Sequence, residues 1–450
     1  MSDLEERDRR YVWHPFTQMS DWMDSHPVVI ERGEGNYLID TEGNRYLDGI
    51  SSMWVNLHGH DHPKLRRAIH EQLDRIAHST LLGLASIPSI EVAERLVRLA
   101  PEGLTRCFFS DNGSTAMEVA IKLAFQYWQQ RGDPDSVRRT RFVALRDAYH
   151  GDTLGAVSLG GVTSFHDSFR PLTFATLRAE NSYCYRCPYG LEHPACDLHC
   201  LESLEGVLAK HGDEVAAVVV EPVMQAPAGM IPFPEGWLRR ARSLCDEAGT
   251  LLITDEVATG FGRTGRMFAC EHEGVTPDLM ALAKGMTAGF LPLAATLVTE
   301  ELFEAFLGPV QAGRQFFHGH SYTGNALACA ATLANLEIFE EERVLERVAR
   351  TGEYLGERLE ALESLPSVGN IRRRGLMAGV ELVRDRDTKA RFDAADRIAH
   401  LVCSAMRRRG VILRPLGDTV VVMPPLSVSE AEIDHLTGAL AECIAEVTGA

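Results

Sequence analysis

Long hydrophobic runs are missing from this sequence. No apolar segment approaches the roughly 20 residues that a membrane-spanning helix needs. The opening residues, MSDLEERDRRYVWHPF, carry charges of both signs and lack the apolar core of a signal peptide. We therefore expect a cytoplasmic enzyme.

Basic residues are also few, with 45 lysines and arginines against 63 aspartates and glutamates and a net charge of −18 at pH 7. This balance opposes binding to nucleic acids or anionic membranes through bulk electrostatics. It does not exclude a local basic pocket.

Cysteine is too sparse for a disulfide scaffold, with ten in 450 residues. Four cysteines nevertheless gather in segment 182–200, SYCYRCPYGLEHPACDLHC, as a CxxC pair followed by a CxxxC pair. This spacing suits a structural zinc site or an iron–sulfur cluster, with Cys184, Cys187, Cys196 and Cys200 as ligands. Redox-active thiols and a loop without metal are the alternatives.

The arrangement of short apolar runs predicts an α/β protein. Runs such as RFVAL, AAVVVEP, TLLITDE and AATLVT alternate with helical segments, which favours a largely parallel sheet. We also expect strands in FATL and RCFFS. Several runs are apolar throughout, as is typical of strands buried on both faces.

The chain divides into three expected parts. Residues 1–75 hold an N-terminal arm and antiparallel strands, and residues 76–345 form the large α/β domain with the cysteine-rich insertion at 182–200. Residues 346–450 form a small α+β domain, in which we expect one strand over NIRRRGLMAGVEL and two over VILRPLGDTVVVMPP.

The segment 250–289 carries the strongest chemical signal. A buried strand ends on Asp255, and a second apolar segment leads to Lys284, which has no charged neighbour between Leu279 and Phe290. Desolvation lowers the pKa of a lysine and makes it a nucleophile for carbonyls. In a pyridoxal phosphate site, such a lysine forms the Schiff base and a carboxylate keeps the pyridine nitrogen protonated. A capping aspartate and a surface-reaching lysine are the alternative.

Polar residues at other strand ends point to the same cleft, because ligands bind at the carboxyl ends of parallel strands. Gly113 and Ser114 open a helix whose N-terminus suits a phosphate, unless the turn is an ordinary cap. Tyr149 precedes His150 and suits stacking on a flat ring, unless it is a half-buried core residue. Glu221 follows a third buried strand.

Two other positions leave alternatives open. Arg414 lies in an apolar strand and either pairs with an internal carboxylate or binds a substrate carboxylate. His58, His60 and His62 alternate in a glycine-containing loop, where hydrogen-bonded histidines are favoured over a metal site.

The sequence resembles the class III aminotransferases of pyridoxal phosphate fold type I over nearly its whole length. The resemblance rests on DEVATGFGRTG, Lys284, the AYHG turn and SYTGN before an alanine-rich helix. It implies a large domain with a mostly parallel seven-stranded sheet and a small α+β domain built from both termini.

The resemblance also implies roles for individual residues. Lys284 would hold the cofactor and move the proton, Asp255 would face the ring nitrogen, and Ser321 would reach the phosphate of a neighbouring subunit in a homodimer. The other implied cofactor contacts are Gly113, Ser114, Tyr149 and His150, and the implied substrate contacts are Trp54, Tyr149, Lys284, Gly319 and Arg414.

Within that class, WHPFTQM, DGISSMWVNLHGHDHP and RPLGDTVVVMPP resemble the branch that aminates 8-amino-7-oxononanoate to 7,8-diaminononanoate in biotin synthesis. Members that use S-adenosylmethionine typically have Tyr at Phe16 and Trp at Met53, so lysine stays open as the amino donor. An ω-amino acid:pyruvate transaminase and a non-enzymatic metal sensor on this scaffold are the alternative functions.

Overall fold

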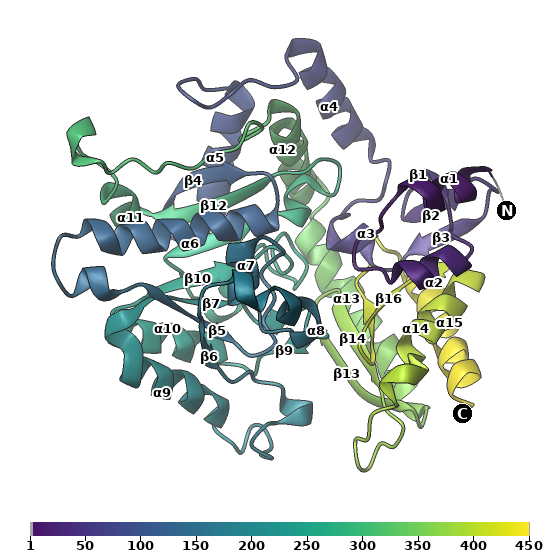
Figure 1. The fold of residues 1–450 in the computed structure, drawn as a ribbon. Helices are drawn as coiled ribbons and strands as arrows, with labels where there is room; N and C mark the ends of the chain where they lie inside the picture. Colours follow the sequence, from purple (N-terminus) through teal and green to yellow (C-terminus); the bar gives the residue numbers. More distant parts are fainter. Residues whose placement is uncertain (1–2, 450) are drawn as a thin grey trace.

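A seven-stranded sheet lies at the centre of the computed structural model, which describes residues 3–449 (Figure 1). The expected parts 1–75 and 346–450 include residues 1, 2 and 450, which lie outside the described residues. From edge to edge the strands are β4 (Leu104–Ser110), β12 (Ala294–Thr299), β11 (Leu279–Leu282), β10 (Leu251–Asp255), β7 (Val215–Val220), β5 (Arg141–Leu145) and β6 (Leu177–Ala179). Only the pairings made by β12 are antiparallel, so the expected mostly parallel sheet is confirmed.

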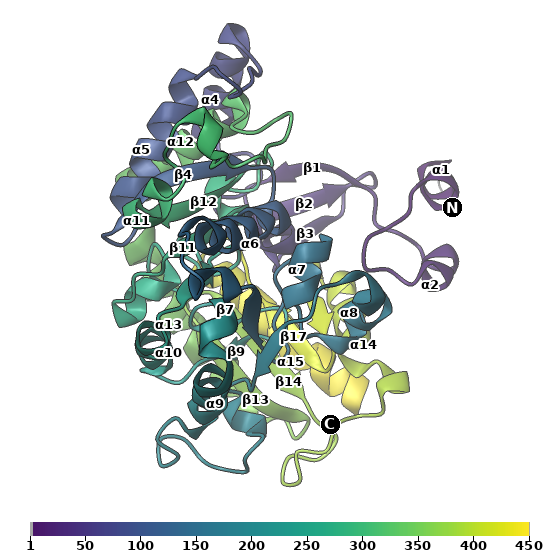
Figure 2. The same ribbon diagram turned by 60° about the vertical axis from the view of Figure 1, so that its left-hand side comes forward.

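Both faces of this sheet are covered, as the unbroken apolar runs predict. In β7, Val218 and Val220 belong to one hydrophobic cluster, whereas Ala217 and Val219 belong to the other. Helices α6 (Gly113–Gln130) and α7 (Leu154–Leu159) contact one face (Figures 1 and 2). The other face is covered by α5 (Ile87–Leu99), α9 (Glu202–His211), α10 (Trp237–Glu247) and the alanine-rich α12 (Ala326–Glu341), which also packs on α4 (Pro63–Arg75).

The two ends of the chain build the smaller part of the molecule together, on the right of Figure 1. One sheet runs β1 (Ile30–Glu34), β2 (Tyr37–Asp40), β3 (Arg45–Asp48) and β15 (Val411–Ile412), with β15 parallel to β3. The other runs β13 (Val368–Arg374), β14 (Met377–Leu382), β17 (Thr419–Val422) and β16 (Arg414–Leu416). Helices α13 (Val344–Glu360), α14 (Ile398–Arg408) and α15 (Glu430–Thr448) complete this part.

Three strand predictions need correction. The segment NIRRRGLMAGVEL is a hairpin of β13 and β14 instead of one strand, because Gly375 turns the chain at a φ of 56°. The strand expected in FATL begins only at Leu177, since the backbone N–H of Phe174 is held by the Ser158 hydroxyl. The segment VILRPLGDTVVVMPP forms three strands instead of two, because β15 joins the N-terminal sheet whereas β16 and β17 belong to the other sheet.

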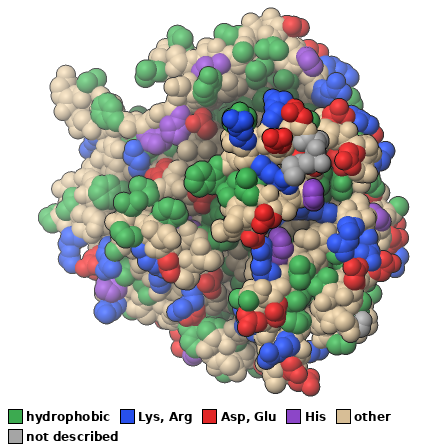
Figure 3. All heavy atoms as spheres, turned by 45° about the vertical axis from the view of Figure 1, so that its right-hand side comes forward, with side chains coloured by type: hydrophobic (Ala, Val, Ile, Leu, Met, Phe, Trp, Pro, Cys, Tyr) green, Lys and Arg blue, Asp and Glu red, His purple; other side chains and the backbone are tan. Residues whose placement is uncertain are grey.

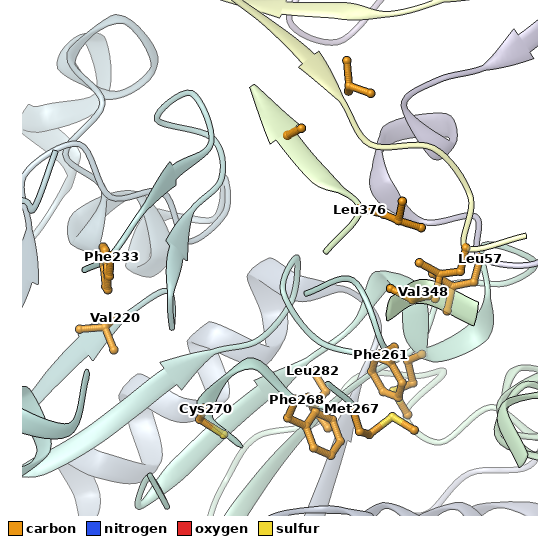
Figure 4. Close-up of a cluster of buried hydrophobic side chains, with 14 of the residues drawn as sticks. Leu57, Val220, Phe233, Phe261, Met267, Phe268, Cys270, Leu282, Val348 and Leu376 are labelled. Carbon is orange, nitrogen blue, oxygen red and sulfur yellow. The ribbon is translucent and has the colours of Figure 1, made fainter. Parts of the chain in front are cut away.

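The glycine-rich turn after β10 joins the two parts of the molecule. Phe261 and Phe268 of this turn lie in the same buried cluster as Leu57, Val348 and Leu376 (Figure 4). Leu57 comes from the N-terminal segment, and the other two come from α13 and the turn before β14. The carboxyl end of β10 is thereby fixed against both chain termini.

The surface carries mixed charges. On the face drawn in Figure 3, acidic and basic side chains are interspersed with hydrophobic ones. Within residues 3–449, no helix is long and apolar enough to cross a membrane.

Candidate active site

A cavity of about 720 Å³ lies at the carboxyl ends of the central strands, where the sheet meets the smaller part of the molecule. The expected residues that line it are Trp54, Gly113, Ser114, Tyr149, His150, Asp255, Lys284 and Arg414. The structure therefore brings together chemical groups from segments far apart in the sequence.

Lys284 lies just beyond the end of β11, at the start of the short 3₁₀ helix η7 (Lys284–Thr287). Its backbone φ of 45° is unusual for a residue with a side chain, and such strain is concentrated at functional sites. Its ammonium group lies 4.7 Å from the centre of the Trp54 ring. Loss of hydration lowers the pKa of Lys284 to about 8, although the charges of Asp255 and Glu221 oppose this shift. The neutral amine is thus easier to reach than in an ordinary lysine.

Asp255 is buried at the end of β10 and is held by two contacts. Its Oδ2 lies 2.7 Å from Nδ1 of His150, and its Oδ1 accepts a hydrogen bond of 3.0 Å from the backbone N–H of Val257. Nε2 of His150 is buried without a hydrogen-bond partner. This arrangement orients a carboxylate toward the cavity and leaves one imidazole nitrogen available.

The N-terminus of α6 forms another wall of the cavity. Asn112 caps the helix by accepting from the Thr115 N–H at 3.1 Å, and the first N–H groups of a helix have no partner within it. A Cβ on Gly113 would lie 2.5 Å from Val257, so only glycine allows this close approach. Ser114 Oγ accepts from the Asp152 N–H at 3.0 Å. The site suits an anion such as phosphate.

Tyr149 is fixed on three sides. Its ring stacks on the buried ring of His166, with centroids 5.9 Å apart. Its hydroxyl donates to Asp152 at 2.7 Å, and its backbone N–H donates to Glu221 at 3.2 Å. Because the ring also lines the cavity, Tyr149 can present a rigid aromatic surface to a flat ligand.

Glu221 and Phe165 are the main residues of the cavity whose roles the sequence did not reveal. Glu221 accepts from the N–H groups of Tyr149 and Ala226, and burial together with nearby Asp255 raises its pKa well above the usual range. The position of Glu221 directly after a buried strand had indicated that it belongs to this cleft, but not which groups it contacts. The ring of Phe165 contacts those of Phe16 and Tyr149 edge to face, which the sequence does not indicate.

Arg414 lines the cavity from strand β16. It forms no ion pair with a carboxylate among residues 3–449; instead it donates to the Met53 sulfur and lies 5.5 Å from the centre of the Phe16 ring. Burial lowers its pKa. Of the two sequence hypotheses, the internal ion pair is therefore not found in this structure.

Two expected residues lie elsewhere in the single chain. Gly319 and Ser321 do not line the cavity, and the Ser321 carbonyl accepts from His78 Nε2 at 2.7 Å. The Ser321 side chain is exposed to solvent. The nearby Thr323 hydroxyl accepts from the His320 N–H at 2.9 Å, which is loop chemistry.

The cysteine-rich segment does not bear out the metal hypothesis. Across the part of the chain that the structure describes, no group of three or more His, Cys, Asp or Glu side chains is placed to hold an ion. The four thiols line one small cavity, and burial together with the neighbouring thiols raises the pKa of Cys184 and that of Cys200, the latter to about 11. The predicted set Cys184, Cys187, Cys196 and Cys200 is therefore not supported as a zinc or iron–sulfur site.

The three alternating histidines bind separate partners. His58 contacts Asn335 at 2.7 Å, His60 contacts Asp48 at 3.1 Å, and His62 contacts Glu342 at 3.0 Å. Each histidine thus has a separate hydrogen-bond partner, and the three do not converge on one point.

The residues of the cavity fit pyridoxal phosphate. A lysine with a lowered pKa, a buried carboxylate, a free helix N-terminus and a fixed tyrosine ring match its aldehyde, ring nitrogen, phosphate and flat ring. The close approach that only Gly113 permits supports the phosphate position.

Comparisons with known proteins agree with this geometry. The class III aminotransferase family model matches residues 18–444. The adenosylmethionine-8-amino-7-oxononanoate aminotransferase of Nitratidesulfovibrio vulgaris is 56% identical, covering 99% of this chain and 82% of that protein. The crystal structure of the enzyme of that name from Methanocaldococcus jannaschii has a TM-score of 0.93, 44% identity and 98% of each chain covered. An (S)-enantioselective omega-transaminase from Thermomicrobium roseum has a TM-score of 0.93, 37% identity, and 99% of this chain and 98% of that chain covered. The chain belongs to the class III aminotransferases, which use pyridoxal phosphate.

Proposed function

We propose that the protein aminates 8-amino-7-oxononanoate to 7,8-diaminononanoate, with S-adenosylmethionine as the amino donor. The names of its similar relatives support this activity. The observation that carries this proposal is the position of Arg414. Its guanidinium lines the same cavity as Lys284 and donates to the Met53 sulfur instead of pairing with a carboxylate of the described residues. A keto acid with a distal carboxylate and a ketone would use both residues at once.

We assign the cofactor contacts to this chain's own residues. Gly113 and Ser114 would bind the phosphate, Tyr149 would cover one face of the ring, and Asp255 would hold the proton on the ring nitrogen. His150 would keep the carboxylate of Asp255 in position through its 2.7 Å contact. When bound, pyridoxal phosphate supplies an aldehyde for the amine and a ring that accepts electrons.

Lys284 would then act as the proton carrier. Its neutral amine takes the proton from the α-carbon of the donor and returns one at the cofactor C4′ position, and the second half-reaction runs in reverse. The lowered pKa of Lys284 favours the neutral form that this role requires. A Lys284→Ala variant with full turnover would contradict this assignment.

The substrate side is built by both termini. Arg414 would pair with the distal carboxylate of the keto acid, and Trp54 would line the apolar path to Lys284. Substrate selection would then fall to residues 1–75 and 346–450, the two terminal parts, although α4 at the end of the first part packs on α12 of the central part.

Lysine remains the second candidate donor. Phe16 and Met53, the two positions at which this chain departs from the S-adenosylmethionine pattern, both contact Arg414. Both departures thus lie beside Arg414, the residue that would bind the substrate carboxylate. This position supports testing lysine as well as S-adenosylmethionine as the amino donor.

We further propose a homodimer with shared active sites. Large apolar side chains are exposed in two neighbouring loops, including Leu82 (89% exposed), Val310 (75%) and Phe317 (82%). Burying such a surface favours association. Gly319 and Ser321 follow these residues in the second loop, from which they would reach the cavity of the other subunit.

A half-reaction tests the function directly. Purified holoenzyme is mixed separately with S-adenosylmethionine, lysine and alanine, and the visible cofactor band is followed without keto acid. Bleaching by S-adenosylmethionine supports the proposed donor, and bleaching by lysine alone identifies lysine. Bleaching by alanine alone would favour an omega-transaminase. The structural similarity to the Thermomicrobium roseum omega-transaminase is the reason for including this test.

A further inference from the structure

The cysteine-rich insertion is anchored on the small domain, although it belongs to the large one in sequence. The Tyr183 hydroxyl donates to Glu381, and Arg186 Nε donates to the same carboxylate at 2.6 Å. Arg186 also donates to the Lys389 carbonyl at 2.8 Å, while the Lys389 ammonium donates to the Tyr185 carbonyl at 2.9 Å. The start of the insertion is thus tied to β14 and to the loop that follows it.

Glu381 is the centre of this network. Its side chain is only 3% exposed, and a third donor, Arg372 Nη1, lies 2.7 Å away on the neighbouring strand β13. Burial alone would raise the pKa of Glu381, but the charge of Arg372 and the hydrogen bonds of Tyr183 and Arg186 lower it. The carboxylate therefore stays ionised and fully hydrogen-bonded inside the protein.

Arg372 extends the network toward the cavity. Its remaining guanidinium nitrogens donate to the carbonyl of Gly229 at 2.7 Å and to that of Met230 at 3.0 Å. These residues form the turn between β8 (Met224–Gln225) and β9 (Ile231–Pro232). Strand β14 approaches this turn so closely that a Cβ on Gly379 would lie 3.1 Å from the Gly229 carbonyl. The turn between β8 and β9 is therefore held by hydrogen bonds from Arg372 and by close packing against β14.

The same turn forms part of the wall behind the cavity. Met230 is buried in a cluster with Trp54, Ala258 and Met377, against which Leu416 packs. Trp54, Ala258 and Leu416 line the cavity, as does Pro227 within the turn. A displacement of the turn would thus move the apolar surface between Lys284 and the substrate end.

We propose that Glu381 is a positioning residue for the substrate, and that Tyr183, Arg186, Arg372 and Glu381 form a clamp between the insertion and the cavity wall. The insertion then serves as an anchor that sets the width of the apolar path. The effect on keto-acid affinity rests on the proposed function, whereas the clamp itself does not.

The test compares Glu381→Gln, which keeps the shape but removes the charge, with the milder Tyr183→Phe, which removes only one hydroxyl. Arg408→Ala is the control, because it breaks an exposed ion pair with Glu446 in the same domain. Hydrogen exchange of the purified holoenzymes is followed at residues 183–190 and 226–231, together with kcat and KM for the keto acid.

We expect both clamp variants to speed exchange in the two segments together. Glu381→Gln should raise KM by about tenfold with little change in kcat, Tyr183→Phe should raise it less, and the control should change neither. Exchange at 226–231 that stays at the control level in Glu381→Gln overturns the clamp. Faster exchange with an unchanged KM overturns the positioning role. If the wild-type protein does not use the keto acid, the proposed function fails, and the exchange data alone decide the clamp.

Discussion

At the scale of single residues, Lys284 depends on its surroundings for its reactivity. The sequence predicts the lysine, the aspartate at the strand end and the glycine of the helix N-terminus, because each has a recognisable local pattern. It does not reveal that His150 holds Asp255 or that Met53 and Phe16 contact Arg414. Those contacts join segments whose separation in the chain carries no local signal.

The pKa of Lys284 predicts a pH-dependent stability of the cofactor-free protein. The folded protein releases this proton near pH 8, while the unfolded chain keeps it up to about 10.5, so the unfolded state binds more protons between these values. The free energy of unfolding of wild type, relative to Lys284→Met, should therefore rise across this window by at most about 3 kcal/mol. Urea unfolding at pH 7, 9 and 10.5 measures it, and a difference that does not change with pH would contradict the lowered pKa.

Arg414 yields a second residue-scale prediction. Arg414→Ala should raise KM for the keto acid by about 10- to 100-fold, the loss expected for hydrogen bonds to a charged group. Arg414→Lys should retain part of the affinity, because a point charge remains without the guanidinium fork. Steady-state kinetics with each substrate varied will test this. Equal damage to the donor half-reaction would instead identify a structural arginine.

At the scale of elements, the turn after β5 has to approach the start of α6 closely. A Cβ on Gly151 would lie 2.2 Å from the Ser114 hydroxyl, and its φ of 121° disfavours any side chain. Gly151→Ala should therefore push the Tyr149 turn away from the phosphate end and weaken pyridoxal phosphate binding by at least about tenfold. Equilibrium binding to the cofactor-free protein provides the measurement.

A matched control is available in α15. Gly438 has open space around it and a φ outside the left-handed region, so Gly438→Ala should leave cofactor affinity unchanged and stabilise the helix by about 0.5–1 kcal/mol. Equal cofactor loss in both variants would indicate general destabilisation.

Elements were predicted best where a pattern is local. The continuous apolar runs revealed the buried strands β7 and β10, and the antiparallel strands near the N-terminus were recognised from their alternation. The β13–β14 hairpin was missed because its turn at Gly375 lies inside one apolar and basic stretch. The four cysteines had metal-like spacing, but spacing cannot show how a loop folds: segment 182–200 docks on the small domain through Tyr183 and Arg186 instead.

At the scale of the whole molecule, the exposed apolar loops predict that assembly and cofactor retention are coupled. Leu82→Glu together with Phe317→Glu places charges on the proposed dimer surface and should shift the protein to monomers. If partner residues complete the phosphate site, the monomers should also lose pyridoxal phosphate. Sedimentation velocity with absorbance at a visible wavelength follows both properties. Monomers that retain the cofactor fully would contradict shared active sites.

The pairing of β3 with β15 also constrains the order of events during synthesis. The N-terminal sheet is completed by residues 411–412, and Asn36 and Ser51 are held by Ser427 and Met423, so these bonds wait until nearly the whole chain has left the ribosome. The central strands, by contrast, are all available by residue 299. We therefore expect that the central sheet can form while the sheets built from both termini are still incomplete, which leaves their apolar edges exposed until synthesis is nearly finished.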